Sequence, residues 1–169
     1  MKHSETRWLD PHQQRQWRAI QRGIALLGDH LDRDLMAATG LSLNEYEVMV
    51  RLSEAPGRRQ RMSVLAEGLV NSRSRLSHTV GRMEAKGLVS RCKADGDRRG
   101  VICSLTDEGY AHLEAAAPIH VASVRERLVD VISAEQLEVL GQSFAQIAAA
   151  IEGAAVVGVP GPDRGHDGS

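Results

Sequence analysis

A cluster of hydrogen-bond donors occupies residues 72–82 of the 169-residue chain. If this stretch is helical, at about 100° per residue, Leu76, Val80 and Met83 share one face and polar side chains take the opposite face. The donors on that face and beside the helix N-terminus are Ser72, Arg73, Ser74, Arg75, Ser77, His78 and Arg82. Arginine can contact guanine, and serine or histidine can reach base edges or phosphates. The chemistry indicated is hydrogen bonding to a nucleic acid.

A second set of charged side chains follows in the turn-rich segment Ala94–Gly100, where Asp97 directly precedes Arg98 and Arg99. An arginine on such a turn can enter a narrow minor groove, whose negative potential attracts it, while the aspartate fixes the geometry of the loop. The alternative is an ordinary polar turn with a surface ion pair. The position of this segment beside the donor helix favours a nucleic-acid contact.

The charge is unevenly distributed along the chain. Its net charge is only −1, yet residues 58–104 hold nine Arg and two Lys against four acidic residues, a local charge of +7. A basic segment between acidic ones is typical of a module that binds phosphate while the rest of the protein does not. The alternative is a solvated, arginine-rich face.

Turn and cap residues predict the elements that position these donors. We expect a short helix, a tight turn, a second helix capped by Ser72 and ended by Lys86-Gly87, and a hairpin. Their ranges are 62–68, 69–71, 72–85 and 88–105, with β runs at 88–93 and 101–105. A helix-turn-helix followed directly by a hairpin is the order of a winged helix-turn-helix.

Long helices are predicted on both sides of this lobe. Asp10, Pro11 and Gln13 have the pattern of a helix start, and Gly40 that of a stop. Between them, apolar residues recur every three or four positions, at Trp17, Ile20, Ile24, Leu27, Leu31 and Leu35. A capping box at Ser42–Glu45 opens the next helix. The long apolar stripe requires a partner surface.

The C-terminal part repeats this pattern. Thr106 caps a helix that runs towards Val131 and in which Pro118 should produce a kink. A capping box at 133–136 precedes a stripe similar to a coiled-coil seam, at Leu137, Leu140, Phe144, Ile147 and Ile151. Glycine and proline are frequent after Gly153, which predicts a disordered tail.

Five motifs in register resemble the MarR family of bacterial transcription regulators. They are Leu65-Ala66-Glu67, Ser72-Arg73-Ser74, Arg82–Val89, Asp97-Arg98-Arg99 and Ser104–Gly109. The resemblance is strong over residues 41–109 and looser in the flanking helices. It implies a mainly α (α+β) fold, with a winged helix-turn-helix at 41–105 between dimerisation helices at 1–40 and 106–153, and a tail at 154–169. The stripes would then meet those of a second copy.

The resemblance also implies a function. A MarR-like homodimer would be a sequence-specific transcriptional regulator, a repressor, that binds a pseudo-palindromic operator in double-stranded DNA. Arg99 would enter the minor groove with Asp97 orienting it, and Arg98 would meet phosphate. The sequence departs from the family pattern at Met83, His78 and Asn71, which affects the base readout.

The family resemblance further suggests that the protein releases DNA when a small aromatic, often phenolic, or anionic effector binds between the dimerisation helices and the DNA-binding lobe. The candidate ligand-binding residues are His12, Arg15, Trp17, Arg18, Tyr46 and Met49. The alternative is that the aromatic residues belong to the core and the arginines are solvated.

The two cysteines suggest a redox alternative. In a symmetric hairpin Cys92 and Cys103 would oppose each other on the two strands, as a thiol switch would require. Because cytosolic thiols are normally reduced, the competing interpretation is that both are small strand residues without a redox role.

Other function classes find no support in the sequence. We identify no nucleophile elbow, phosphate-binding loop or metal-ligand spacing, so we predict neither an enzyme nor a cofactor or metal site. His112 and His120 are more consistent with solvated or satisfied side chains than with ligands. The longest apolar run is short, which predicts a cytoplasmic protein without a membrane span. A non-enzymatic dimeric scaffold that has lost DNA binding remains an alternative.

Overall fold

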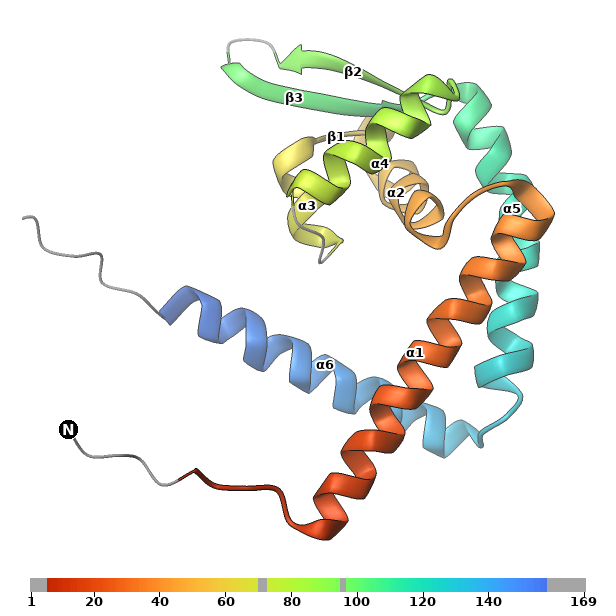
Figure 1. Ribbon diagram of the computed structural model, residues 1–169. Coiled ribbons are helices and arrows are strands. Elements are labelled where there is room, and N and C mark those ends of the chain that lie inside the picture. The colour runs from red at the N-terminus through yellow and green to blue at the C-terminus, as the bar shows by residue number, and fades with distance from the viewer. Residues whose placement is uncertain (1–5, 70–72, 95–96, 158–169) are drawn as a thin grey trace, which may run out of the picture. The chain divides into compact units, whose positions relative to one another are not determined.

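A computed structural model describes residues 6–69, 73–94 and 97–157 of the chain. The chain divides into two compact units, residues 1–127 and 128–169, which are described separately. The first unit contains α1 (Pro11–Thr39), α2 (Leu43–Glu54), the 3-10 turn η1 (Pro56–Arg58), β1 (Arg59–Arg61), α3 (Met62–Gly68), α4 (Arg73–Ala85), β2 (Val89–Ala94), β3 (Asp97–Leu105) and α5 (Asp107–Val124) (Figure 1). The π-helical turn η2 (Arg125–Val129) follows, and α6 (Ala134–Val157) belongs to the second unit. Among the helices described, none is long and apolar enough to cross a membrane.

The helix starts lie where the cap residues predict them. At α1 the Asp10 carboxylate accepts the Gln13 N–H at 2.8 Å, and the Gln13 side chain accepts the Asp10 N–H at 3.0 Å. The same reciprocal bonds link Ser42 with Glu45 at α2, and residues 133 and 136 at α6. Gly40 ends α1 in the left-handed conformation that glycine favours, with φ +71°.

The wing, which is the hairpin formed by β2 and β3, is part of a three-stranded antiparallel sheet in the order β1-β3-β2. We did not predict β1, because its sequence Arg-Gln-Arg has no apolar alternation. It is held by pairing with the C-terminal half of β3, from Arg59 opposite Ser104 to Arg61 opposite Ile102. The strand thereby closes the base of the hairpin and leads directly into α3.

The core of the first unit lies beneath α4. Leu76, Val80 and Met83 are at most 2% exposed and pack with buried residues of α2, α3 and the sheet, as the helix periodicity predicts. The α1 stripe divides into two parts. Leu31 and Leu35 are buried, whereas Trp17, Ile20 and Ile24 are 46–52% exposed. The N-terminal half of α1 therefore presents an apolar surface to its surroundings.

Two boundaries differ from the sequence prediction. The α-helical part of α5 continues through Pro118 to Val124 and is followed by η2, so the helix does not stay α-helical as far as Val131. Helix α6 extends to Val157, four residues beyond the predicted end at Gly153. The predicted disordered tail otherwise lies outside the described residues.

Candidate nucleic-acid interface

Helix α4 presents the predicted donor face. Ser74, Arg75, Ser77, His78 and Arg82 are all exposed, opposite the buried apolar face. The remaining two donors, Ser72 and the side chain of Arg73, lie outside the described residues. An exposed polar helix of 13 residues, backed by a packed core, has the form that reads a major groove.

The wing extends from the same lobe. Strands β2 and β3 pair in register from Val89 opposite Leu105 to Lys93 opposite Val101, and the register shifts between Lys93 and Ala94. The backbone of Asp97, Arg98 and Arg99 opens β3. Their side chains lie outside the described residues, so their roles stay predictions from the sequence.

Several cations of the basic segment are bound by acidic side chains within the lobe. Arg58 lies 3.3 Å from Asp107 and stacks on the Tyr110 ring, 3.6 Å from its centroid. Arg91 binds Glu84, and Lys86 binds Glu45. Sequence reasoning missed these pairs, because each joins elements whose contact depends on the fold. The surface charge available to a nucleic acid is correspondingly smaller than the residue count suggests.

Glu45 is a buried anchor for the end of α4. Its side chain is 2% exposed, and its carboxylate accepts the Ser42 N–H at 2.9 Å and Lys86 Nζ at 3.1 Å. Lys86 also donates to the Gly40 carbonyl at 3.3 Å. Arg82 Nε approaches the same carboxylate to 3.8 Å. Arg82, predicted only as a DNA contact, therefore also has a partner within the protein.

These interactions determine the ionisation of Glu45. Burial raises the pKa of its carboxyl, but hydrogen bonds from Ser42 and Lys86, together with attraction to the Lys86 ammonium, outweigh burial. The pKa therefore lies below its ordinary value of 4.5. The ionised carboxylate connects the α1–α2 corner to the last turn of α4.

Comparison with known proteins identifies the family of this lobe. A sequence model of the MarR family matches residues 39–100. The transcriptional regulator HosA of Escherichia coli is 36% identical over 102 residues, which cover 60% of this chain and 73% of HosA. The chain belongs to the MarR family. Members of this family are transcriptional regulators, so the chain is a regulator and not an enzyme, as the sequence predicts.

Solved MarR-family structures share the fold over most of the chain. AbsC from Streptomyces coelicolor is 41% identical with a TM-score of 0.81, covering 88% of this chain and 99% of AbsC. A second MarR-family regulator from that organism, solved in complex with DNA, is also 41% identical, with a TM-score of 0.84. That alignment covers 88% of this chain and 92% of the relative. The predicted winged helix-turn-helix with flanking helices is confirmed.

The predicted cysteine pairing in this MarR-family wing is wrong. Cys103 lies opposite Arg91, and Cys92 lies opposite Ile102, one residue from the predicted register. Because successive strand residues point to opposite faces, this shift separates the thiols. Cys92 is exposed, whereas Cys103 is buried and burial raises its pKa to about 11. A thiol switch formed by these two cysteines is therefore not supported.

The structure does not gather the predicted effector-binding residues of this MarR-family chain. Tyr46 and Met49 are buried in the core, and the Tyr46 ring lies 4.6 Å from the His120 ring, centroid to centroid. The other four candidates are exposed near the start of α1; they are His12, Arg15, Trp17 and Arg18. About 30 Å of helix separates Arg18 from the α1–α2 corner, at 1.5 Å per residue. These two groups do not line one site within a single chain.

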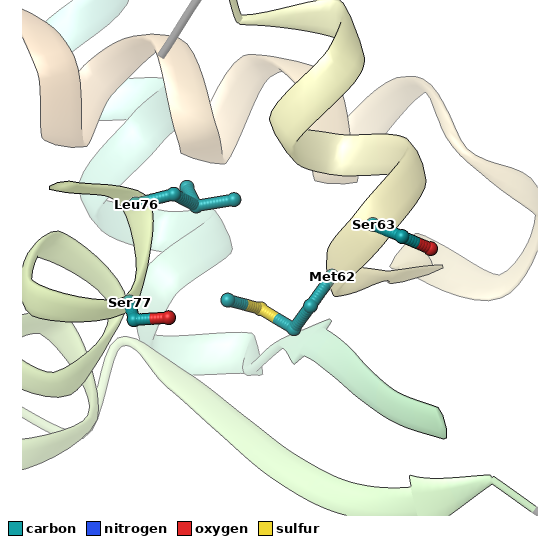
Figure 2. Close-up of a pocket in the computed structure, with 4 residues that line it drawn as sticks. All are labelled: Met62, Ser63, Leu76 and Ser77. Atoms are coloured by element: carbon teal, nitrogen blue, oxygen red, sulfur yellow. The ribbon is translucent and has the colours of Figure 1, made fainter. Parts of the chain in front are cut away.

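Two cavities in the described part of the chain lie elsewhere. One, of about 170 Å³, is lined by Met62, Ser63, Leu76 and Ser77 at the crossing of α3 and α4. Met62 extends from the start of α3 towards Leu76 and Ser77 (Figure 2). The other, of about 290 Å³, is lined by Gly23, Leu26, Leu27, His30 and Arg127. Neither cavity is lined by a predicted effector-binding residue, and Ser77 is a predicted DNA contact, so the effector stays a prediction.

Substituting the buried carboxylate tests the Glu45 anchor. We expect Glu45→Gln to lower the free energy of unfolding by about 1–2 kcal/mol at pH 7, because a charged hydrogen-bond acceptor is lost. Because the pKa of Glu45 is lower in the folded than in the unfolded protein, the contribution of its charge to stability is complete above pH 4.5. This contribution is lost as the pH falls from 4.5 through the pKa of the folded state. Urea denaturation between pH 7 and pH 3 should therefore show a shrinking difference between variant and wild type.

Glu47 on the same helix provides the matched control. Burial raises the pKa of Glu47, so its ionised form opposes folding near neutral pH. Glu47→Gln should consequently cost no stability at pH 7. A Glu45→Gln deficit that stays constant down to pH 3 would contradict the role assigned to the Glu45 charge.

Proposed function

We propose that the protein is a transcriptional repressor that binds a pseudo-palindromic operator as a homodimer. The observation that carries this proposal is the exposed donor face of α4, next to a wing within a segment of charge +7. The 41% identical MarR-family relative solved in complex with DNA supports it. Contacts from α4 to base edges would give sequence specificity, and arginine contacts to phosphates would give affinity that depends on salt.

The homodimer is proposed from the apolar surfaces that each unit leaves uncovered. On α1, Trp17, Ile20 and Ile24 are 46–52% exposed, and on α6, Phe144 and Ile151 are 40% and 66% exposed. Fully burying one such side chain contributes about 1.5–3 kcal/mol. A second copy offers matching stripes and a two-fold axis, as two operator half-sites require.

The binding test uses the DNA upstream of the protein's own gene. We expect this fragment to be retarded in a gel-shift assay, with an affinity that falls steeply as salt rises. A shuffled fragment of equal length measures non-specific binding. Failure to retard either fragment at low salt would contradict the proposal and favour the dimeric scaffold.

The role of the α1 stripe can be tested by adding one charge to it. Ile24→Asp should weaken self-association by about tenfold or more, because the carboxylate would be desolvated in the interface. Operator affinity should fall with it, because a monomer contacts one half-site. Sedimentation velocity and fluorescence anisotropy at the same protein concentration measure the two effects.

Ala19→Asp is the matched control for this variant. Ala19 is an exposed residue of α1 and lies outside the apolar stripe, at about 120° from its middle. The substitution introduces the same charged side chain into the same helix. Equal loss of self-association in both variants would place the interface elsewhere.

A further inference from the structure

An ion pair joins the recognition helix α4 to the wing. The Glu84 carboxylate, near the end of α4, accepts Arg91 Nε at 3.0 Å and Arg91 Nη2 at 2.5 Å. It also accepts the backbone N–H of Arg91 at 3.1 Å. Two of these bonds join the two side chains, and the third joins the Glu84 carboxylate to the Arg91 backbone. Together they fix the orientation of α4 and β2 at this point as well as their distance.

The pair lies at the base of a projecting arm. Arg91 on β2 is opposite Cys103 on β3, and Cys103 is in turn paired with Gln60 on β1. The pairing of β1 ends at Ile102, so from there to its tip the hairpin has two strands only. Figure 1 shows β2 and β3 continuing past β1. The contact of Arg91 with α4 therefore lies in the three-stranded base, one residue before the position at which the pairing of β1 ends.

Glu84 is an acidic residue inside the basic segment. Its side chain is 36% exposed and that of Arg91 35% exposed, so neither is required to fill the core. Removing Glu84 leaves the Arg91 charge unpaired and raises the positive charge of the lobe by one. On electrostatics alone, this change should tighten binding to any DNA.

We propose that Glu84 and Arg91 are positioning residues that hold the wing at a fixed distance and angle from the recognition helix. This inference rests on the proposed function. A helix in the major groove and a wing in the neighbouring minor groove must engage one duplex together. An arm fixed in advance loses less conformational freedom on binding than one free to swing. Loss of the pair should therefore weaken operator binding despite the gain in positive charge.

The first test compares two acidic residues of the lobe. Glu84→Ala should weaken binding to the fragment from upstream of the protein's own gene about fivefold, while binding to the shuffled fragment stays unchanged or becomes tighter. Glu67→Ala removes the same charge from the exposed surface of α3 and should not weaken operator binding. Fluorescence anisotropy at fixed salt gives both affinities, and circular dichroism verifies that each variant is folded.

Each outcome of this comparison is informative. If the wild type fails to bind the fragment, the proposed function is contradicted. If the wild type binds and Glu84→Ala binds as well as Glu67→Ala does, the positioning role is overturned. Glu84→Gln keeps one acceptor for Arg91, so it should bind the operator more tightly than Glu84→Ala but less tightly than the wild type. It provides the test if the alanine variant does not fold.

A double-mutant cycle tests whether the effect passes through the wing. Once Arg99 at the wing is replaced by alanine, the arm's position matters less. Glu84→Ala should then add little further loss, so the two effects are not additive. Glu67→Ala should add independently of Arg99→Ala. If the losses of affinity from Glu84→Ala and Arg99→Ala are strictly additive, Glu84 does not act through the wing and the proposed positioning role is overturned.

Discussion

Gly109→Ala is expected to lower the free energy of unfolding by about 3 kcal/mol. Gly109 lies in the first turn of α5, and a Cβ at this position would be 2.0 Å from the Leu88 carbonyl oxygen and 2.8 Å from Leu105 Cδ1. The carbonyl cannot move aside without further loss, because it accepts the Thr106 N–H at 3.1 Å and the Thr106 hydroxyl at 3.0 Å. The methyl group must therefore displace backbone at the junction of the sheet and α5.

Gly81→Ala is the control for this prediction. An added Cβ at Gly81 meets nothing within 4 Å, and the residue lies inside α4. This substitution should raise stability by about 1 kcal/mol, because alanine favours a helix over glycine. Urea denaturation at one protomer concentration measures both variants. A Gly109→Ala variant within about 0.5 kcal/mol of wild type would contradict the predicted clash.

Local signals predicted most helices of this fold. Asp10 with Gln13 and Ser42 with Glu45 act within one helical turn, and α1 and α2 begin directly after these caps. The buried face of α4 also follows from helix periodicity, since Leu76, Val80 and Met83 recur along one side. Such features require no knowledge of distant parts of the chain.

Features that depend on pairing between distant segments were not predictable. Strand β1 is stabilised by β3, far along the chain, and its own residues give no strand signal. The pairing of β2 with β3 is displaced by one residue from that of a symmetric hairpin, and this displacement places Cys92 and Cys103 on opposite faces of the sheet. The sequence identified the two hairpin strands, β2 and β3, but not their register.

The same limit applies to the interface. Periodicity identified the donor face of α4, including Arg82, but could not show that Glu45 approaches it from α2. Nor could it show that Glu84 faces the wing, because a turn separates it from Arg91. Helical patterns assign a residue to a face, whereas its partners depend on how the elements pack.

Arg99→Ala is expected to weaken operator binding by about five- to 150-fold at physiological salt, because loss of a specific groove contact costs about 1–3 kcal/mol. A narrow minor groove concentrates negative potential, so an arginine inserted there gains more than one at the exposed backbone. Arg98→Ala supplies the comparison, because a phosphate contact should weaken operator and shuffled DNA alike and reduce the salt slope by about one.

The two arginines are adjacent and carry the same charge, so the pair of variants separates position from charge. If Arg99 enters the minor groove, its loss should reduce the ratio of operator to shuffled binding, whereas loss of Arg98 should leave that ratio nearly constant. Anisotropy titrations at several salt concentrations provide both quantities. A change of less than twofold for Arg99→Ala would contradict the wing assignment. Equal effects on the ratio would show that the wing contributes charge alone and that α4 carries the specificity.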